Sequence, residues 1–199
     1  MVLKDAGKKI SGFWVIVKRV MAVLCVWGLI FSVSTIARLG VAFDYDDGLA
    51  FTSPAYQKAD AQALPLTDRY WSIVNNSYDL DRPKILPYTL AWLFRLSGFR
   101  VAVITGRPAI DDEALAKDWR HLVPHGRFIF TGNPQRTHIY LAKERYLLYF
   151  GASDADIEQA RLAHVYPIRI LRSSRSYVAD AYHPRTLGDK VLPLSQYSF

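Results

Sequence analysis

The chain has 199 residues, which is enough for one globular domain with a sizeable core. Its formal charge of +7 is uneven: residues 1–40 hold six basic side chains against one acidic, and the rest holds 19 basic and 17 acidic. The basic excess therefore belongs to the N-terminus, which argues against a nucleic-acid-binding domain. The only cysteine, Cys25, also lies there, so the remainder has no thiol and is compatible with an oxidising envelope compartment.

The segment from Val20 to Ile36 carries no charge and is largely apolar. It is close to the lower limit of about 17 residues for a membrane-spanning helix. Because basic residues precede it, the positive-inside rule predicts a cytoplasmic N-terminus and an exported domain. Small residues in Ser32-Val33-Ser34 and Thr35-Ile36-Ala37 leave a cleaved signal peptide as the alternative. We expect residues 1–38 to be a membrane anchor or signal sequence, and favour the anchor because few residues separate Ile36 from the first strand.

The first predicted strand is the apolar run Val41-Ala42-Phe43, which ends at Asp44 and Asp46 and is followed by Gly48. In an open α/β sheet, ligands collect at the carboxyl ends of strands, so chemistry is expected here. Residues two apart on an extended backbone point the same way. Asp44 could attack a phosphorus atom and Asp46 could handle the proton of the leaving group. A solvated Asp-rich turn is the alternative.

The remaining chain alternates between predicted helices and strands. Residues 47–82 form a long connection rich in aromatic residues, with Ser53-Pro54 and Leu64-Pro65 as loops and a short helix from Asp68 to Val74. Helices are then expected at 83–97, from a cap at Asp111, at 137–145 and at 154–164, and strands at 99–104, 127–130, 146–150 and 167–171. This alternation predicts an α/β fold with a parallel sheet and helices on both faces.

The stretch Phe43-Asp44-Tyr45-Asp46-Asp47-Gly48, with Phe51-Thr52-Ser53-Pro54 after it, resembles the first motif of the class B acid phosphatases. These are periplasmic members of the haloacid dehalogenase (HAD) superfamily. The likeness continues in order through further stretches: Tyr70-Trp71, Asn75-Asn76, Pro83-Lys84, Thr105-Gly106-Arg107, Gly151 to Ile157 and Ile168 to Arg172. The resemblance implies an HAD-like domain over residues 39–199 with a small cap at about 47–82. It also implies a domain in the periplasm, either anchored in the inner membrane or exported.

The same resemblance implies roles for individual residues. Asp44 is the expected nucleophile that becomes an aspartyl phosphate, and Asp46 the general acid that later acts as base. Thr105-Gly106-Arg107 matches the second motif and is expected to bind phosphate. The expected magnesium ligands are Asp44, the backbone carbonyl of Asp46, and Asp154 or Asp156.

Aromatic residues are expected beside the substrate's organic part. Tyr56 and Tyr78 belong to the cap segment, and Tyr177 lies where the family has an aromatic residue bordering the pocket. The alternative for each ring is that it simply packs the cap against the sheet.

Three positions depart from the family pattern. Gly48 stands where the family has threonine, Thr137 where it has the lysine that bridges nucleophile and phosphate, and Ala152 where it has a magnesium-binding aspartate. Arg136 or Lys143 could replace the lysine. Losing one carboxylate predicts weak Mg²⁺ binding.

Two functions follow from these altered motifs. The first is hydrolysis of a small phosphomonoester through an aspartyl phosphate, impaired by the three departures. The alternative is a non-catalytic HAD-like pseudoenzyme that serves as an interaction component of a cell-envelope assembly. In either case the N-terminal helix, if it is not cleaved, is expected to attach the protein to a membrane. No nucleic acid is expected as a partner, and a homo-oligomer or envelope protein partners remain open.

Overall fold

The computed structural model describes residues 2–124, 126–177 and 180–199, with side chains from residue 13 onward. Its centre is a six-stranded sheet in the order β5-β4-β1-β6-β7-β8, and every neighbouring pair is parallel. The strands are β1 (Gly40–Asp44), β4 (Arg100–Thr105), β5 (Phe128–Phe130), β6 (Tyr146–Gly151), β7 (Tyr166–Ile170) and β8 (Lys190–Leu192). The HAD-like α/β fold with a parallel sheet is thereby confirmed.

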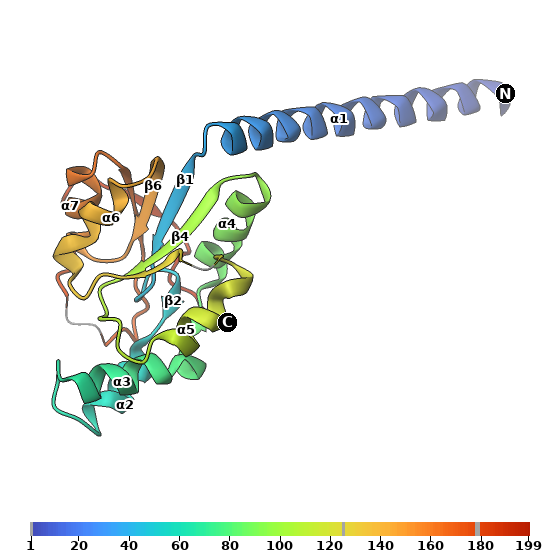
Figure 1. Ribbon diagram of the computed structural model, residues 1–199. Helices are drawn as coiled ribbons and strands as arrows, with labels where there is room; N and C mark the ends of the chain where they lie inside the picture. The colour runs from blue at the N-terminus through green and yellow to red at the C-terminus, as the bar shows by residue number, and fades with distance from the viewer. Residues whose placement is uncertain (1, 125, 178–179) are drawn as a thin grey trace.

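Helices cover both faces of this sheet (Figure 1). On one face, α4 (Ile85–Leu96) and α5 (Glu113–Asp118) pack on Val41 and Phe43 of β1. On the other, α6 (Thr137–Leu141) and α7 (Asp154–Leu162) pack against Ala42. This division follows from the strand itself, because successive residues of β1 point to opposite faces and all five are buried.

A helical segment lies across the carboxyl ends of the strands (Figure 1). It contains α2 (Ser53–Asp60) and α3 (Asp68–Asn76), the short two-stranded antiparallel sheet of β2 (Ala50–Phe51) and β3 (Arg82–Pro83), and the 3₁₀ turn η1 (Tyr78–Leu80). The Thr67 side chain accepts from the amide of Tyr70 and begins α3. Two further 3₁₀ turns, η2 (Trp119–His121) and η3 (Pro134–Arg136), join sheet elements elsewhere.

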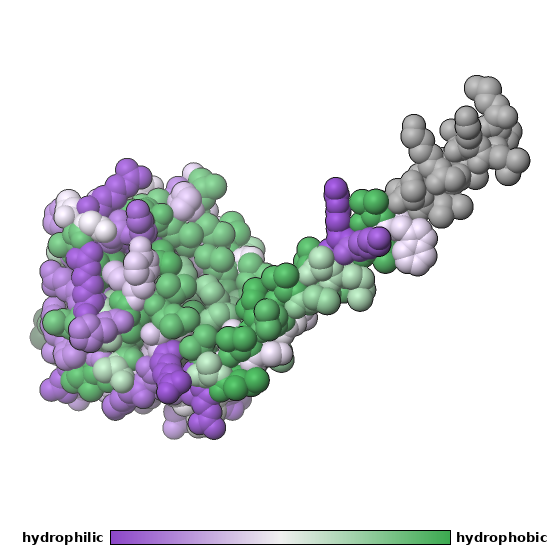
Figure 2. Space-filling view, turned by 90° about the horizontal axis from the view of Figure 1, so that it is seen from above, coloured by the Kyte–Doolittle hydropathy of each residue, from purple (hydrophilic) through white to green (hydrophobic). Residues whose placement is uncertain are grey.

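A single long helix, α1 (Val2–Ile36), precedes the sheet. Among the described residues, its part from Phe13 to Ile36 is the one helix long and apolar enough to cross a membrane. It is largely exposed, and Ser34 near its end is buried at the junction with the domain. Figure 2 shows it leaving the domain next to a concentration of hydrophobic residues. This agrees with an anchor or a signal sequence and does not choose between them.

Several local predictions were wrong. Ser53-Pro54, expected as loop, begins α2, because proline is tolerated in the first turn of a helix. Asp111, expected as a helix cap, has a left-handed φ of 48°, and α5 begins after Asp112. The helix expected at 137–145 ends at Leu141. The short strand β8 was not predicted, since three residues carry little periodic signal.

Candidate active site

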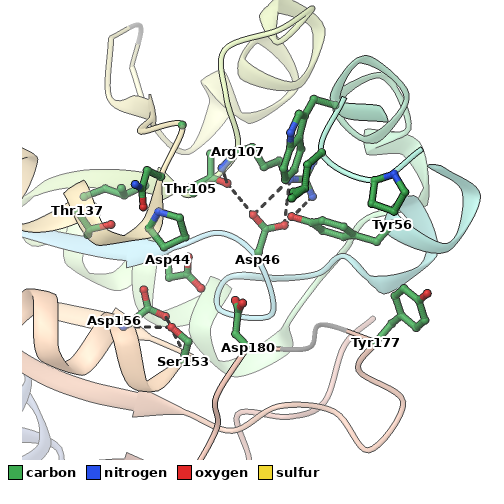
Figure 3. Close-up of a pocket in the computed structure, with 18 of the residues that line it drawn as sticks. Asp44, Asp46, Tyr56, Thr105, Arg107, Thr137, Ser153, Asp156, Tyr177 and Asp180 are labelled. Atoms are coloured by element: carbon green, nitrogen blue, oxygen red, sulfur yellow. Dashed lines mark hydrogen bonds and ion pairs between the residues drawn. The ribbon is translucent and has the colours of Figure 1, made fainter. Parts of the chain in front are cut away.

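The carboxyl ends of the central strands meet at one cavity of about 1000 Å³ beneath the segment that contains α2 and α3. Asp44 ends β1, Thr105 ends β4, and Ser153 and Asp156 lie at the start of α7, which follows β6 (Figure 3). Since β4 and β6 are the two neighbours of β1, the parallel topology itself brings these residues together.

Asp44 is the most isolated carboxylate of the cavity. Its side chain is 7% exposed, and within the part of the chain that the structure describes no donor is hydrogen-bonded to its carboxylate. Burial, followed by the neighbouring charges of Asp156 and Asp46, holds the pKa of Asp44 well above its ordinary value, while Arg172 acts in the opposite direction. A buried carboxylate without a partner is costly, so a ligand that neutralises it would be stabilised here.

Asp46, by contrast, is fully engaged. Its carboxylate accepts from Thr105 Oγ1 at 2.6 Å and from Arg107 Nη2 at 2.7 Å and Nε at 3.0 Å. The amide of Arg107 donates to Thr105 Oγ1 at 3.1 Å. The two side chains expected on phosphate therefore contact the second aspartate in this structure.

Arg107 also ties the site to the helical segment above it. Its guanidinium is fully buried, lies 3.4 Å from the Asp81 carboxylate, and stacks over the rings of Tyr45 and Tyr56 with its Cζ atom 5.0 and 5.2 Å from their centroids. Burial raises the pKa of Asp81 to about 7 although Arg107 acts to lower it. Nearby, the Asn75 amide of α3 donates to two carbonyls of the loop after β4, those of Pro108 and Ile110.

Asp154 and Asp156, in the stretch from Gly151 to Ile157, have different partners. Asp156 lines the cavity, but its carboxylate accepts from Tyr149 Oη and, through the capping box of α7, from the amides of Ala152 and Ser153. Asp154 is not among the lining residues: it pairs with Arg169 at 2.8 Å and with His183 at 2.7 Å. Although its partial burial acts to raise it, the pKa of Asp154 is lowered by these hydrogen bonds.

Of the residues expected at the magnesium ion, Asp44, Asp46 and Asp156 line the cavity and Asp154 does not. No group of three His, Cys, Asp or Glu side chains in the described ranges stands close enough to hold a metal ion. The Asp156 carboxylate already accepts hydrogen bonds, and Asp154 is paired with Arg169 and His183 outside the cavity. The hydrogen bonds to the Asp46 carboxylate leave open the role expected for its backbone carbonyl. The chemistry that remains suits at most a cation held by one or two carboxylates together with water and substrate.

Two of the three aromatic residues expected beside the substrate line the cavity. Tyr56 and Tyr177 line the cavity, as do Tyr70 and Trp71. Tyr78 does not line the cavity. It packs against the hydrophobic core on the face of the sheet that α4 and α5 cover.

The three altered positions have clear structural settings. Thr137 lines the cavity at the start of α6 and is buried, whereas Arg136 and Lys143 do not line it. Ala152 is fully buried beside Asp156. At Gly48 there is no room for a side chain, because an added Cβ would lie 2.3 Å from the carbonyl oxygen of Asp44.

Asp180 was missed from the sequence. Its carboxylate lines the same cavity, and Figure 3 shows it directed toward Asp46 from below. Burial raises the pKa of Asp180, with Arg172 acting against this and Asp156 and Asp46 adding to it. No sequence motif includes Asp180, which lies in the irregular stretch between β7 and β8.

Lys84 belongs to the Pro83-Lys84 stretch that resembles the family. It is fully buried, and its Nζ donates to the carbonyls of Asp47 and, at 2.9 Å, Leu171. Burial lowers the pKa of the Lys84 amine to about 8, against the influence of Asp47 and Asp44. The lysine thus joins the loop after β1 to the end of β7.

An all-parallel sheet with two aspartates at the end of its central strand and Thr-Gly-Arg at the end of the next defines a protein of the HAD type. No protein-family model matches the chain. The class B acid phosphatase of Edwardsiella ictaluri (strain 93-146) is 33% identical over 180 residues, which cover 81% of this chain and 73% of that protein. The class B acid phosphatase of Xenorhabdus bovienii (strain SS-2004) is 29% identical over 174 residues, covering 80% and 73%. The chain belongs to the class B acid phosphatase family.

Solved structures are more distant. A putative haloacid dehalogenase-like hydrolase from Bacteroides fragilis aligns with a TM-score of 0.48 at 14% identity, covering 78% of this chain and 96% of that one.

Proposed function

We propose that the domain hydrolyses small phosphomonoesters with Asp44 as the nucleophile. The observation that carries this is the buried Asp44 carboxylate, which faces the cavity without a hydrogen-bonding partner among the described residues, two positions before an Asp46 held in place by Thr105 and Arg107. Membership of a phosphatase family supports the same reaction class.

The proposed reaction has two displacements. In the first, a carboxylate oxygen of Asp44 attacks phosphorus, the bond from phosphorus to the leaving alkoxide breaks, and Asp46 in its protonated form gives the alkoxide a proton. In the second, Asp46 takes a proton from water, the water oxygen attacks phosphorus, and the bond to Asp44 breaks to release phosphate. As held here, the Asp46 carboxylate is an acceptor, which is the form that the second displacement requires.

The chemistry that a bound Mg²⁺ supplies is neutralisation of the phosphate oxygens. Asp44 and Asp180 are the two cavity carboxylates that we propose would hold it, because neither accepts a hydrogen bond within the described chain. Tyr56 and Tyr177 would border the organic part of the substrate.

A pseudoenzyme acting in an envelope assembly is the second candidate. Two observations favour it: Thr137 lines the cavity at the position of the family's lysine, and the Arg107 guanidinium is shared between the carboxylates of Asp46 and Asp81. Both reduce the positive charge available to phosphate.

The deciding experiment is an assay of the purified full chain in detergent with 4-nitrophenyl phosphate, with and without magnesium. We expect turnover that Asp44→Asn removes. The exposed Asp68 on α3 gives the matched control, since Asp68→Asn makes the same chemical change outside the cavity. Activity that survives in Asp44→Asn would place the chemistry elsewhere, and no activity in wild type would favour the pseudoenzyme.

We also propose that α1 remains attached as an anchor, with its N-terminus in the cytoplasm and the domain in the periplasm. Its length and its basic flank support this. Mass analysis of membrane-extracted protein would find residues 1–34 still present, whereas a soluble product beginning near Thr35 or Arg38 would establish a signal sequence.

A further inference from the structure

Helix α4 is apolar on its outer side as well as on its inner side. Its inner side contributes Ala91 and, less deeply buried, Leu90 and Phe94 to the core beneath the sheet. On its outer side, Ile85, Leu93 and Leu96 are 43%, 53% and 56% exposed, at helical spacings of eight and three residues. The helix contains no acidic residue and one basic residue, Arg95. Thr89 is exposed between Ile85 and Leu93, but its hydroxyl donates to the Ile85 carbonyl at 2.7 Å within the helix. An exposed apolar surface of this kind is normally covered by something apolar.

The C-terminus enlarges this surface. Ser198 forms a β-bridge with Lys84, and the amide of Ile85 donates to the Tyr197 carbonyl at 2.9 Å. Tyr197 and Phe199 are 57% and 66% exposed. Ile85, Leu93, Leu96, Tyr197 and Phe199 together are called the α4 face below.

The apolar helix α1 joins the domain without a flexible linker. Three residues separate Ile36 from β1, and the last of them is fixed at both ends: the Leu39 amide donates to the Ser34 carbonyl, and the Arg100 amide donates to the Leu39 carbonyl. The orientation of the domain relative to α1 is therefore set by hydrogen bonds on both sides of the junction.

The turn that follows α4 packs directly on the side of α1. Gly98, with a φ of +81°, comes so near that an added Cβ would lie 2.6 Å from Thr35 Oγ1 and 2.8 Å from the Phe31 carbonyl oxygen. Phe31 lies five residues inside the apolar span Phe13–Ile36, which is about 7 Å along a helix. The C-terminal end of α4 is therefore level with the last turns of that span.

We infer that the α4 face rests on the lipid surface where α1 leaves the membrane. This rests on the proposed anchor and not on catalysis. Figure 1 shows α4 and the C-terminus on the side of the sheet toward which α1 extends, and Figure 2 shows hydrophobic residues gathered beside the base of α1. Aromatic residues such as Tyr197 favour the membrane–water interface. None of the residues of the α4 face lines the cavity at the carboxyl ends of the strands, so contact of this face with lipid does not cover the residues that line the cavity.

Fluorescence quenching tests this contact in the full chain, reconstituted into vesicles of phosphatidylcholine and phosphatidylglycerol. In a Cys25→Ser background, a fluorophore is attached at Leu93→Cys or, as a second position, at Leu96→Cys. The matched control is Leu162→Cys at the end of α7, on the other face of the sheet, where the leucine is 63% exposed. One quencher is a nitroxide carried on the lipid, and the other is aqueous iodide.

The two probes on the α4 face are expected to be quenched several-fold more by the lipid nitroxide, and less by iodide, than the Leu162 probe. Equal quenching of all three positions would overturn the inference. Protection from iodide without quenching by nitroxide, lost when the protein is diluted in lipid, would show a second copy on the face and would also overturn it. Detection of a cleaved α1 in cells would remove both the anchor and this contact, while the phosphatase assay would be unaffected.

Discussion

Arg107, in the loop after β4, donates two hydrogen bonds from its guanidinium to the Asp46 carboxylate. Its Nη2 lies 2.7 Å and its Nε 3.0 Å from Asp46 Oδ1. The second motif thereby positions the second aspartate of the first motif. The arrangement fixes Asp46 in one orientation two residues from Asp44, and the buried guanidinium in turn depends on Asp46 and Asp81 for charge balance.

Arg107→Lys tests whether the two hydrogen bonds from Arg107 to Asp46 matter for the proposed reaction. Lysine keeps the charge but loses the planar fork, so it cannot hold both contacts to Asp46. We expect kcat to fall by about 10²-fold or more, the usual contribution of a positioned acid or base, with a changed pH profile. An unchanged kcat and pH profile in a protein that retains its wild-type melting temperature would refute a positioning role.

Asp44→Asn is nearly isosteric and should leave the fold intact while removing turnover. The loss is expected to be several orders of magnitude, because an amide cannot replace the carboxylate oxygen that forms the proposed covalent intermediate. Substituting Asn also removes a buried charge that burial penalises, so the melting temperature should not fall. Steady-state kinetics and thermal unfolding check the two parts separately, and a residual rate equal to that of Asp68→Asn would contradict the assignment.

Gly48→Ala should destabilise the loop between the two aspartates and β2. A Cβ at this position would lie 2.3 Å from the Asp44 carbonyl oxygen and 2.8 Å from its Oδ2, so the loop must move and carry Asp44 with it. A loss of roughly 1–3 kcal/mol in the free energy of unfolding is typical of such overpacking, together with reduced activity. Gly28→Ala in α1, where no atom lies within 4 Å of the added Cβ and the backbone is helical, is the control for the loss of glycine alone.

Gly48 is a position whose structural role could not be predicted from the sequence. Asp44, Asp46, Thr105 and Arg107 could be placed at one sheet edge from strand periodicity and the family pattern, because parallel strands end at a common edge. The threonine missing at Gly48 reads from the sequence as a lost hydroxyl, but in the structure the tightened loop excludes any side chain. The hydrogen-bonding partners of Asp154 and Asp156 could not be predicted from the sequence either. The two residues are only two positions apart, yet Asp156 forms the capping box of α7 and Asp154 pairs with Arg169.

Lys84→Met should change how stability depends on pH. In the folded protein burial lowers the pKa of Lys84 to about 8 from 10.5, so between these values the unfolded chain binds a proton that the native protein does not. The free energy of unfolding of the wild type should therefore rise as pH increases from about 8 to 10.5, by an amount on the order of 3 kcal/mol. Lys84→Met should lack this rise. Urea unfolding in detergent across that range measures it, with the exposed Lys117→Met as control; parallel curves for all three proteins would contradict it.

The last prediction concerns magnesium at Asp44, Asp180 and Ala152. With Asp44 and Asp180 as its two proposed carboxylate ligands, the wild-type chain should bind Mg²⁺ weakly, because this ion needs near-octahedral oxygen ligands and gives up water reluctantly. Asp180→Asn removes one of the two charges and should weaken binding further, by about tenfold or more.

Ala152→Asp adds a carboxylate at a fully buried position beside Asp156 and so should tighten binding. Without a cation the added charge should also lower the melting temperature, because it is buried near Asp156 and Asp44. Magnesium titration by calorimetry, with thermal unfolding at each concentration, tests both parts without requiring turnover. If Asp180→Asn binds as the wild type does, Asp180 is not a ligand. If Ala152→Asp gains neither affinity nor magnesium-dependent stability, position 152 no longer faces a cation site, and the pseudoenzyme function would be favoured.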